Sequence, residues 1–217
     1  VQDETFRSSV LVTVEFVAAS VTFELVLGLF LALVLNQDIP GVGGVRSILM
    51  IPMAISPVAI ALMFKIETQQ EIGIISYMLK AGLGYTFLPL SDSLQAMLLL
   101  VFVDSWQWTP LCLLVFLASL KSLPTDRFEA AQVDGASAFA TLRYITLPSL
   151  RYPIAVLLLL RTMDAFKVFD IVYILTGGGP EWTTQVASYW IYKVGMRFLE
   201  IGSASALSYL LLVIVII

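Results

Sequence analysis

The stretch EAAQVDGASAFATLRYITLP, residues 129–148, is polar and stands between two long apolar runs, 94–120 and 152–176. A helix crosses a bilayer with roughly 20 mostly apolar residues, so each run is long enough to span a membrane. The polar stretch therefore connects two spanning helices. Its Ala and Glu residues favour helix and Gly135 interrupts them, which predicts two short helices on either side of a break.

Three more apolar runs, 10–35, 47–64 and 202–217, complete a set of five predicted spans. Pro52 and Pro57 lie inside the second run and predict kinks, because proline removes a backbone donor. The mixed segment 65–93, which contains Gly73, Gly82, Gly84 and Pro89, is expected to form an exposed loop with a short helix. We therefore predict an all-α polytopic membrane protein with one domain, 1–217, and a polar loop at 121–151.

Composition supports a membrane protein and excludes several other classes. The 217 residues are 59% hydrophobic and 13% charged, whereas soluble domains are roughly 45–50% apolar and 25% charged. The net charge is −4 with no Lys/Arg cluster, so no nucleic-acid partner is expected. The chain lacks His, so no metal site is expected, and Cys112 cannot form an internal disulfide. No G-x-x-x-x-G-K-[ST] occurs, so the chain is not expected to be an enzyme that hydrolyses ATP.

Stretch 129–148 resembles the cytoplasmic EAA loop of binding-protein-dependent ABC importers. The matching residues are Glu129, Ala130, Ala131, Asp134, Gly135, Ala136, Ile145, Leu147 and Pro148. One departure is Leu142, where the family commonly has Phe. Further matches at LGLFLALVLN, RSILMIPMAISPVAIA, the surroundings of Trp106 and FKVFDIVYILTGGGP make the chain similar to the carbohydrate-type permeases for maltose, trehalose and glycerol phosphate.

The resemblance implies a six-helix permease core of which five helices are present, with the first core helix and the end of the last missing. It places residues 1–9 outside the cytoplasm and the EAA loop inside it, in the cytoplasmic (inner) membrane of a prokaryote. The loop would seat in a cleft of the ATPase subunit through Glu129, Ala130, Ala131, Asp134, Gly135 and Ala136. Implied partners are a second, similar permease in a heterodimer, two ATPase subunits that bind ATP and Mg, membrane lipid and an extracellular sugar-binding protein.

Charged side chains at helix centres cost about 2.5–3.5 kcal/mol each on insertion scales, so they should face protein or water. The residues concerned are Glu24, Arg161, Asp164 and Lys167. A spacing of three separates Arg161, Asp164, Lys167 and Asp170, which permits ion pairs along a helix. Such pairs could neutralise one another inside the bundle, line the substrate path, or do both.

A sugar path should combine carboxylates or amides with aromatic rings, because sugars offer hydroxyl groups and apolar C–H faces. Two clusters qualify. The first is Asp104, Trp106, Gln107 and Trp108, and the second is Asp164, Phe166, Phe169, Asp170 and Tyr173. In a continuous helix, residues 166, 169, 170 and 173 would share a face. The tryptophans could instead be interfacial anchors. The glycine run at 177–179 either ends the helix or lies where a binding protein docks.

The sequence thus predicts the permease subunit of an ATP-driven importer that works by alternating access. A di- or oligosaccharide such as trehalose or maltose is the expected substrate. One alternative is a permease of the same superfamily for another solute, such as glycerol phosphate, an amino acid or a polyamine. A second is an ion-coupled secondary transporter, in which the intramembrane carboxylates would serve as coupling sites.

Overall fold

The computed structural model describes residues 4–37, 41–84, 86–89 and 91–216, and this part of the chain contains helices and connections but no strand. The chain divides into two compact units. Unit 1 comprises the residues up to Val21, Ile55–Gln107 and the residues from Thr162. Unit 2 comprises Thr22–Ala54 and Trp108–Arg161. The predicted all-α fold is confirmed, and the single permease domain over 1–217 stays a prediction.

Two helices are long and apolar enough to cross a membrane, α1 (Glu4–Leu35) and α5 (Ser93–Lys121). Two interrupted pairs raise the number to four if each pair forms one span. The first pair joins α2 (Val42–Leu49) and η1 (Ile51–Ala54) to α3 (Pro57–Glu67), and the second joins residues 138–149 to α9 (Arg151–Ala165). A shorter apolar helix, α12, covers Ile201–Ile216. The count of five spans stays a prediction.

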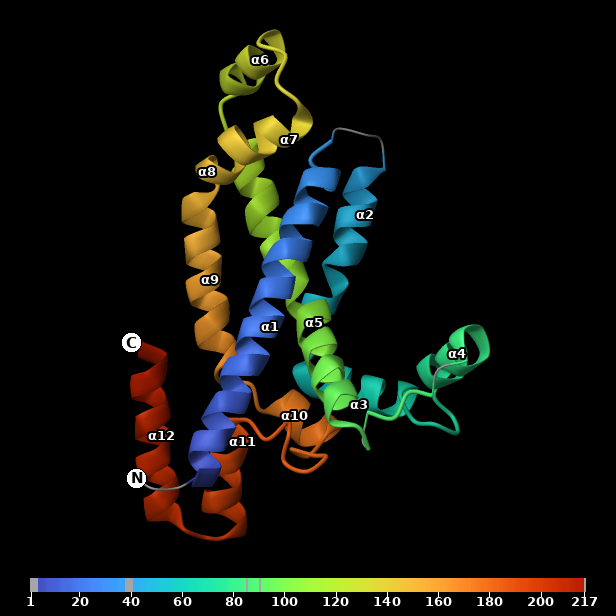
Figure 1. Cartoon of the computed structure of the whole chain (residues 1–217), viewed down its shortest axis with the longest axis vertical. Coiled ribbons are helices and arrows are strands. Elements are labelled where there is room, and N and C mark those ends of the chain that lie inside the picture. Colours follow the sequence, from blue (N-terminus) through green and yellow to red (C-terminus); the bar gives the residue numbers. More distant parts are fainter. Residues whose placement is uncertain (1–3, 38–40, 85, 90, 217) are drawn as a thin grey trace. The chain divides into compact units, whose positions relative to one another are not determined.

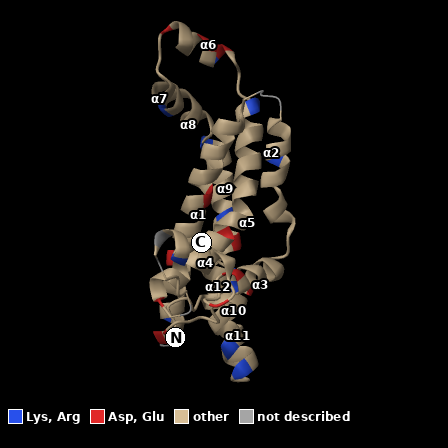
Figure 2. Ribbon diagram, turned by 90° about the vertical axis from the view of Figure 1, so that its right-hand side faces the viewer, with Lys and Arg blue, Asp and Glu red and all other residues tan. Residues whose placement is uncertain are grey.

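The remaining elements are short. They are α4 (Ile74–Leu83), α6 (Asp126–Val133), α7 (Ala138–Thr141), η2 (Leu142–Thr146), α8 (Leu147–Ser149), α10 (Asp170–Leu175), α11 (Ala187–Tyr192) and η3 (Lys193–Arg197). Within unit 2, the α6–α8 segment lies at the ends where α5 finishes and α9 begins (Figure 1). Most of the length of α1, α5 and α9 carries no charge, with a few charged positions partway along (Figure 2).

The predicted kink at the prolines is present as a break between η1 and α3. Pro57 occupies the first turn of α3, where its missing N–H costs nothing. The backbone carbonyl of Ile55 in the break accepts a hydrogen bond from Nε2 of Gln107 at 3.0 Å. This contact replaces a helical partner, which a broken helix inside a membrane requires.

The prediction of one continuous helix over 152–176 is wrong, because α9 ends at Ala165 and α10 begins only at Asp170. The backbone there forms hydrogen bonds between residues three apart instead of four. Lys167 N donates to the Asp164 carbonyl at 3.0 Å, and Val168 N donates to the Ala165 carbonyl at 3.1 Å. The Ser188 hydroxyl donates to the Val168 carbonyl that the break leaves without a helical partner. Phe166 and Phe169 therefore lie in the break and not on a shared face of one helix.

The core of unit 2 forms where α1, α5 and α9 pack together. Its buried residues are Ala32, Leu35, Cys112, Leu113, Phe116, Leu117, Leu120, Leu150 and Leu157. Gly28 allows α1 to approach α5 closely, since a Cβ at this position would lie 2.5 Å from Cβ of Cys112 and 3.1 Å from the Leu113 backbone nitrogen. Small residues serve the same purpose at helix contacts in membrane proteins generally.

Gly28→Ala is expected to destabilise the protein by about 1–3 kcal/mol, because the added methyl group overpacks the contact between α1 and α5. The measurement is the midpoint of thermal unfolding of the purified protein in detergent. Gly43→Ala is the matched control, since a Cβ there meets nothing within 4 Å. Equal midpoints for the two variants would contradict the close helix contact.

Candidate functional site

The α6–α8 segment presents most of its motif residues to the outside of unit 2. Glu129, Ala130 and Asp134 are exposed, while Ala131 is buried at 7% exposure. Glu129 lies in the first turn of α6, where a negative side chain is favoured by the helix dipole. The segment therefore offers an exposed surface of small residues between the acidic side chains of Glu129 and Asp134.

Gly135 shapes the end of α6 through a Schellman turn. Its φ of 71° is left-handed, a conformation that glycine adopts without steric cost. Ala136 N donates to the Ala131 carbonyl at 2.9 Å, and Gly135 N donates to the Gln132 carbonyl at 3.1 Å. Ser137 then caps α7 by accepting a hydrogen bond from Ala140 N at 3.2 Å. The glycine break predicted from the sequence is present here.

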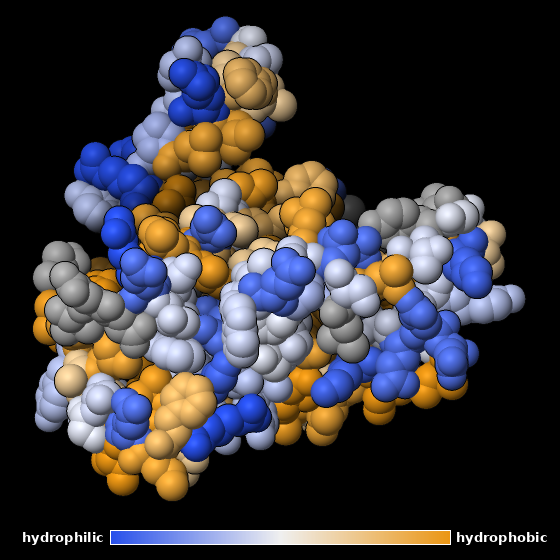
Figure 3. Space-filling view, turned by 60° about the horizontal axis from the view of Figure 1, so that its bottom comes forward, coloured by the Kyte–Doolittle hydropathy of each residue, from blue (hydrophilic) through white to orange (hydrophobic). Residues whose placement is uncertain are grey.

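The large apolar side chains that the same segment exposes include Val133 at 88% and Phe139 at 70%. Figure 3 shows hydrophobic side chains of the α6–α8 segment, at the top of that view, directly beside strongly hydrophilic ones. Sequence reasoning missed both residues. A Val and a Phe among small and polar residues, in a loop outside the predicted spans, are the sequence signal that could have indicated an exposed apolar surface.

Four aromatic rings of unit 1 form a cluster at the break after α9. Phe169 stacks on Tyr173 with ring centroids 5.5 Å apart and planes 15° from parallel. Tyr192 of α11 lies 5.1 Å from Phe169 and 5.5 Å from Tyr173, and Tyr189 lies 6.3 Å from Tyr192. A hydrogen bond with Tyr173 raises the pKa of Tyr192. The sequence indicated Phe169 and Tyr173 but missed the two α11 tyrosines, which SYWIY places three apart on one helical face.

Lys65 holds α10 in position. Its Nζ donates to the Ile174 carbonyl at 2.8 Å, near the C-terminal end of α10 where a cation is favoured. Helices α3 and α10 also pack along each other. This contact fixes the helix that carries Tyr173 and Asp170, and neither partner could be inferred from the sequence.

The other candidates for a substrate path are dispersed. Trp106 packs edge-to-face on Phe64 of α3 at 5.5 Å in unit 1. Asp104 is buried at 3% exposure. Asp170 is exposed at the start of α10. Asp164, Phe166 and Trp108 are half-buried, and Asp164 forms an ion pair with Lys167 at 3.4 Å. Within unit 1, the structure thus brings two of the predicted residues, Phe169 and Tyr173, into one aromatic cluster.

Glu24 and Arg161 form a buried ion pair in unit 2. Nε of Arg161 lies 2.6 Å from Oε2 of Glu24, and Nη2 lies 2.9 Å from Oε1, a bidentate geometry. Their side chains are 0% and 1% exposed. The guanidinium also lies over the ring of Trp108, 4.7 Å from its centroid. Trp108 therefore lies against the charge pair.

The loop after the glycine run is organised around Lys193, which is 6% exposed. Its Nζ lies 3.7 Å from the ring centroid of Trp182 and donates to Oε1 of Gln185 at 3.1 Å. Burial lowers the pKa of Lys193, and the positive charge of Arg197 lowers it further. The arrangement holds Trp182, which is 62% exposed, on the surface of unit 1.

Apolar helices of spanning length, interrupted helices with side-chain partners at the breaks, and a buried ion pair define a polytopic membrane protein of the permease class. The chain belongs to the family described as the binding-protein-dependent transport system inner membrane component, whose model matches residues 24–217. The family resemblance noted from the EAA motif is therefore confirmed.

Two curated relatives and one solved structure illustrate the likeness. The trehalose/maltose transport system permease protein MalF of Thermococcus litoralis is 38% identical over 97% of this chain and 71% of the relative. The trehalose transport system permease protein SugA of Mycobacterium tuberculosis is 36% identical over 96% of this chain and 66% of the relative. A bacterial alginate ABC transporter, solved with a periplasmic protein bound to an alginate pentasaccharide, matches with a TM-score of 0.84, 26% identity and coverage of 99% and 77%.

Glu24→Gln is expected to lower the free energy of unfolding by about 3–5 kcal/mol, because it removes the carboxylate that binds the buried Arg161 guanidinium through two hydrogen bonds. Thermal or denaturant unfolding in detergent measures the loss. Glu15→Gln, at an exposed position of the same helix, is the control and is expected to change little. The double variant Glu24→Gln/Arg161→Gln should be more stable than Glu24→Gln alone. Equal stability of Glu24→Gln and the control would show that the pair is not coupled.

Proposed function

We propose that this chain is the transmembrane permease subunit of an ATP-driven sugar importer in the cytoplasmic membrane of a prokaryote. The observation that carries the proposal is the exposed α6–α8 segment, which displays the residues of the EAA motif on a short helix and a glycine turn. Membership of a binding-protein-dependent family supports it. The chain would work with a similar second permease, two ATPase subunits and an extracellular sugar-binding protein.

The α6–α8 segment would dock in a cleft of the ATPase subunit, which binds ATP and Mg. Ala130 and Ala136 let another backbone approach, and Glu129 offers a charge to a basic partner. Val133 and Phe139, both exposed, supply apolar contact area of the kind that dominates interface energetics. Closure of the ATPase dimer would pull on this segment, and α5 and α9 continue from its two ends into the membrane. The permease would alternate in this way between outward and inward access.

The aromatic cluster is the best-supported contact for a sugar. Tyr173 is 41% exposed, and its hydroxyl, which bonds to Tyr192, has capacity for a further hydrogen bond to a sugar. The relatives named for trehalose and maltose, together with the alginate transporter, favour a di- or oligosaccharide.

An anionic solute such as glycerol phosphate has less support than a sugar. A phosphate group would need an unpaired cation in the path. Arg161 is buried against Glu24 and Trp108, and Lys167 lies 3.4 Å from the Asp164 carboxylate. Amino acids and polyamines are tested alongside sugars in the uptake assay below.

The first test is co-purification of the tagged full-length permease with its ATPase. Glu129→Lys is expected to lose the ATPase through charge reversal, and Gly135→Asp because it places an extra carboxylate on the docking surface. Gly135→Asn should retain more ATPase than Gly135→Ala, because asparagine tolerates the left-handed conformation better. Glu71→Lys is the matched charge control, since Glu71 is exposed on the 65–93 segment.

Retention of the ATPase by wild type and Glu71→Lys, with loss from Glu129→Lys and Gly135→Asp, supports the coupling segment. Absence of any ATPase from the wild-type preparation would overturn the proposal, as would full retention by both motif variants. An uptake assay with ATP depleted and an ion gradient present would then examine the ion-coupled alternative.

The second test is uptake of labelled trehalose or maltose into proteoliposomes. Tyr173→Ala is expected to raise the apparent KM about three- to tenfold, because the sugar loses one stacking ring. Tyr173→Phe should keep the stacking and lose only the hydroxyl. Tyr77→Ala removes an exposed tyrosine of α4 and serves as the control. Unchanged uptake by Tyr173→Ala, or equal competition by an amino acid or polyamine, would count against the sugar site.

A further inference from the structure

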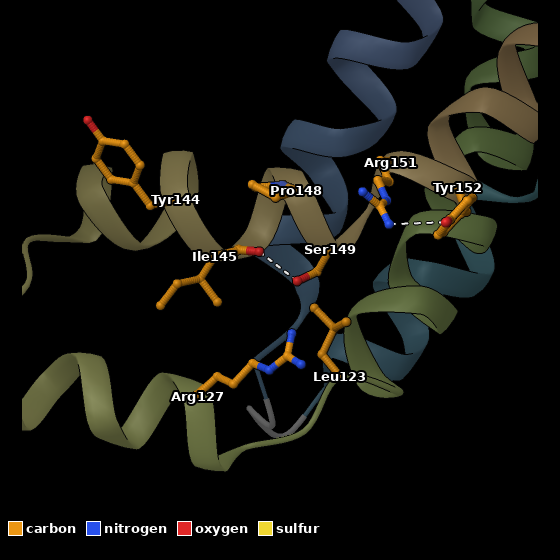
Figure 4. A pocket seen from close by; sticks show the side chains of 8 residues that line it. All are labelled: Leu123, Arg127, Tyr144, Ile145, Pro148, Ser149, Arg151 and Tyr152. Atoms are coloured by element: carbon orange, nitrogen blue, oxygen red, sulfur yellow. Dashed lines mark hydrogen bonds between the residues drawn. The ribbon is translucent and has the colours of Figure 1, made fainter.

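A cavity of about 420 Å³ lies within unit 2 between the α6–α8 segment and the start of α9. It is lined by Leu123, Arg127, Tyr144, Ile145, Pro148, Ser149, Arg151 and Tyr152. Figure 4 shows Arg127 extending from α6 into this space and Ile145 pointing into it from the opposite wall. Arg127, Arg151 and Tyr152 have no place in the EAA motif, so the ATPase-docking role does not account for them.

The cavity is strongly basic. Two of its eight lining residues are arginines and none is acidic. Within the described part of the chain, neither Arg127 nor Arg151 forms an ion pair. Arg151 stacks over the Tyr152 ring at 4.6 Å and donates from Nη2 to its hydroxyl at 3.0 Å, which holds the guanidinium beside the cavity. Planar guanidinium groups suit phosphate oxygens, which accept two parallel N–H bonds.

An apolar stripe starts at the same place. Tyr152, Val156 and Leu159 follow at helical spacing along one face of α9, with exposures of 68%, 55% and 59%. Arg151 is the first residue of α9, where the helix N-terminus adds a favourable field for an anion. A basic cavity thus adjoins a strip of exposed hydrocarbon and aromatic surface, which matches a molecule with an anionic head and an apolar chain.

We propose that this cavity binds the phosphate of an anionic phospholipid headgroup from the cytoplasmic leaflet, with an acyl chain along Tyr152, Val156 and Leu159. This inference rests on the proposed function, in which the α6–α8 segment faces the cytoplasm. Basic pockets at the cytoplasmic ends of spanning helices are suited to such headgroups. The apolar stripe favours a lipid over free phosphate, because free phosphate has no apolar group that could contact the stripe. The headgroup would connect α6, through Arg127, to α9, through Arg151.

The test is lipid binding to the purified transporter complex by native mass spectrometry, with phosphatidylglycerol as the probe and phosphatidylcholine as the zwitterionic comparison. Arg127→Gln and Arg151→Gln are each expected to weaken phosphatidylglycerol binding about fivefold. Arg127→Lys and Arg151→Lys, which keep the charge, should lose less. Arg143→Gln is the control, since Arg143 is an exposed arginine of the same segment that does not line the cavity.

A loss confined to the two cavity arginines supports the lipid site. The site is overturned by equal loss in Arg143→Gln, by equal binding of the two lipids, or by displacement of phosphatidylglycerol by millimolar inorganic phosphate. ATPase retention is read in the same preparations. If the complex keeps its ATPase but binds both lipids equally, the lipid site alone is rejected. If the ATPase does not co-purify with the wild-type permease, the coupling segment is rejected.

Discussion

The bidentate pair of Glu24 and Arg161 is the interaction on which unit 2 depends most. It joins α1 to α9 where neither charge reaches solvent, and Trp108 of α5 closes over it. A buried ion pair adds little net stability by itself, yet either charge alone would be very costly. The pair therefore specifies which helix faces meet. Gly28 and Cys112 complete that specification by setting how close α1 and α5 come.

Helix breaks are the second constraint, and each has an identifiable side-chain partner. Gln107 binds the Ile55 carbonyl before α3, and Ser188 binds the Val168 carbonyl between α9 and α10. Backbone groups at membrane depth need such partners because lipid supplies none. The break after α9 also turns Phe169 and Tyr173 toward the tyrosines of α11. The aromatic cluster thus follows from an interrupted helix, which a regular helix could not provide.

Local features of this fold could be predicted from the sequence, whereas contacts between distant segments could not. The apolar runs, the proline break and the Gly135 turn each depend on residues close together in the chain. Arg161 pairs with a residue 137 positions away, which its sequence neighbours give no means of predicting. The break at 166–169 contains no proline or glycine that would predict it from the sequence. Lys65 and the two α11 tyrosines reach the candidate site only through tertiary packing.

The Schellman turn at Gly135 closes through main-chain groups alone, with Ala136 N bonded to the Ala131 carbonyl and Gly135 N to the Gln132 carbonyl. The outward side chains at positions 133 and 139 take no part in it. Shape and surface chemistry are consequently separable in this segment. Under the proposed coupling role, a cell that holds several transporters of this architecture could keep one loop geometry in all of them and change only those outward side chains, so that each permease would select its own ATPase subunit.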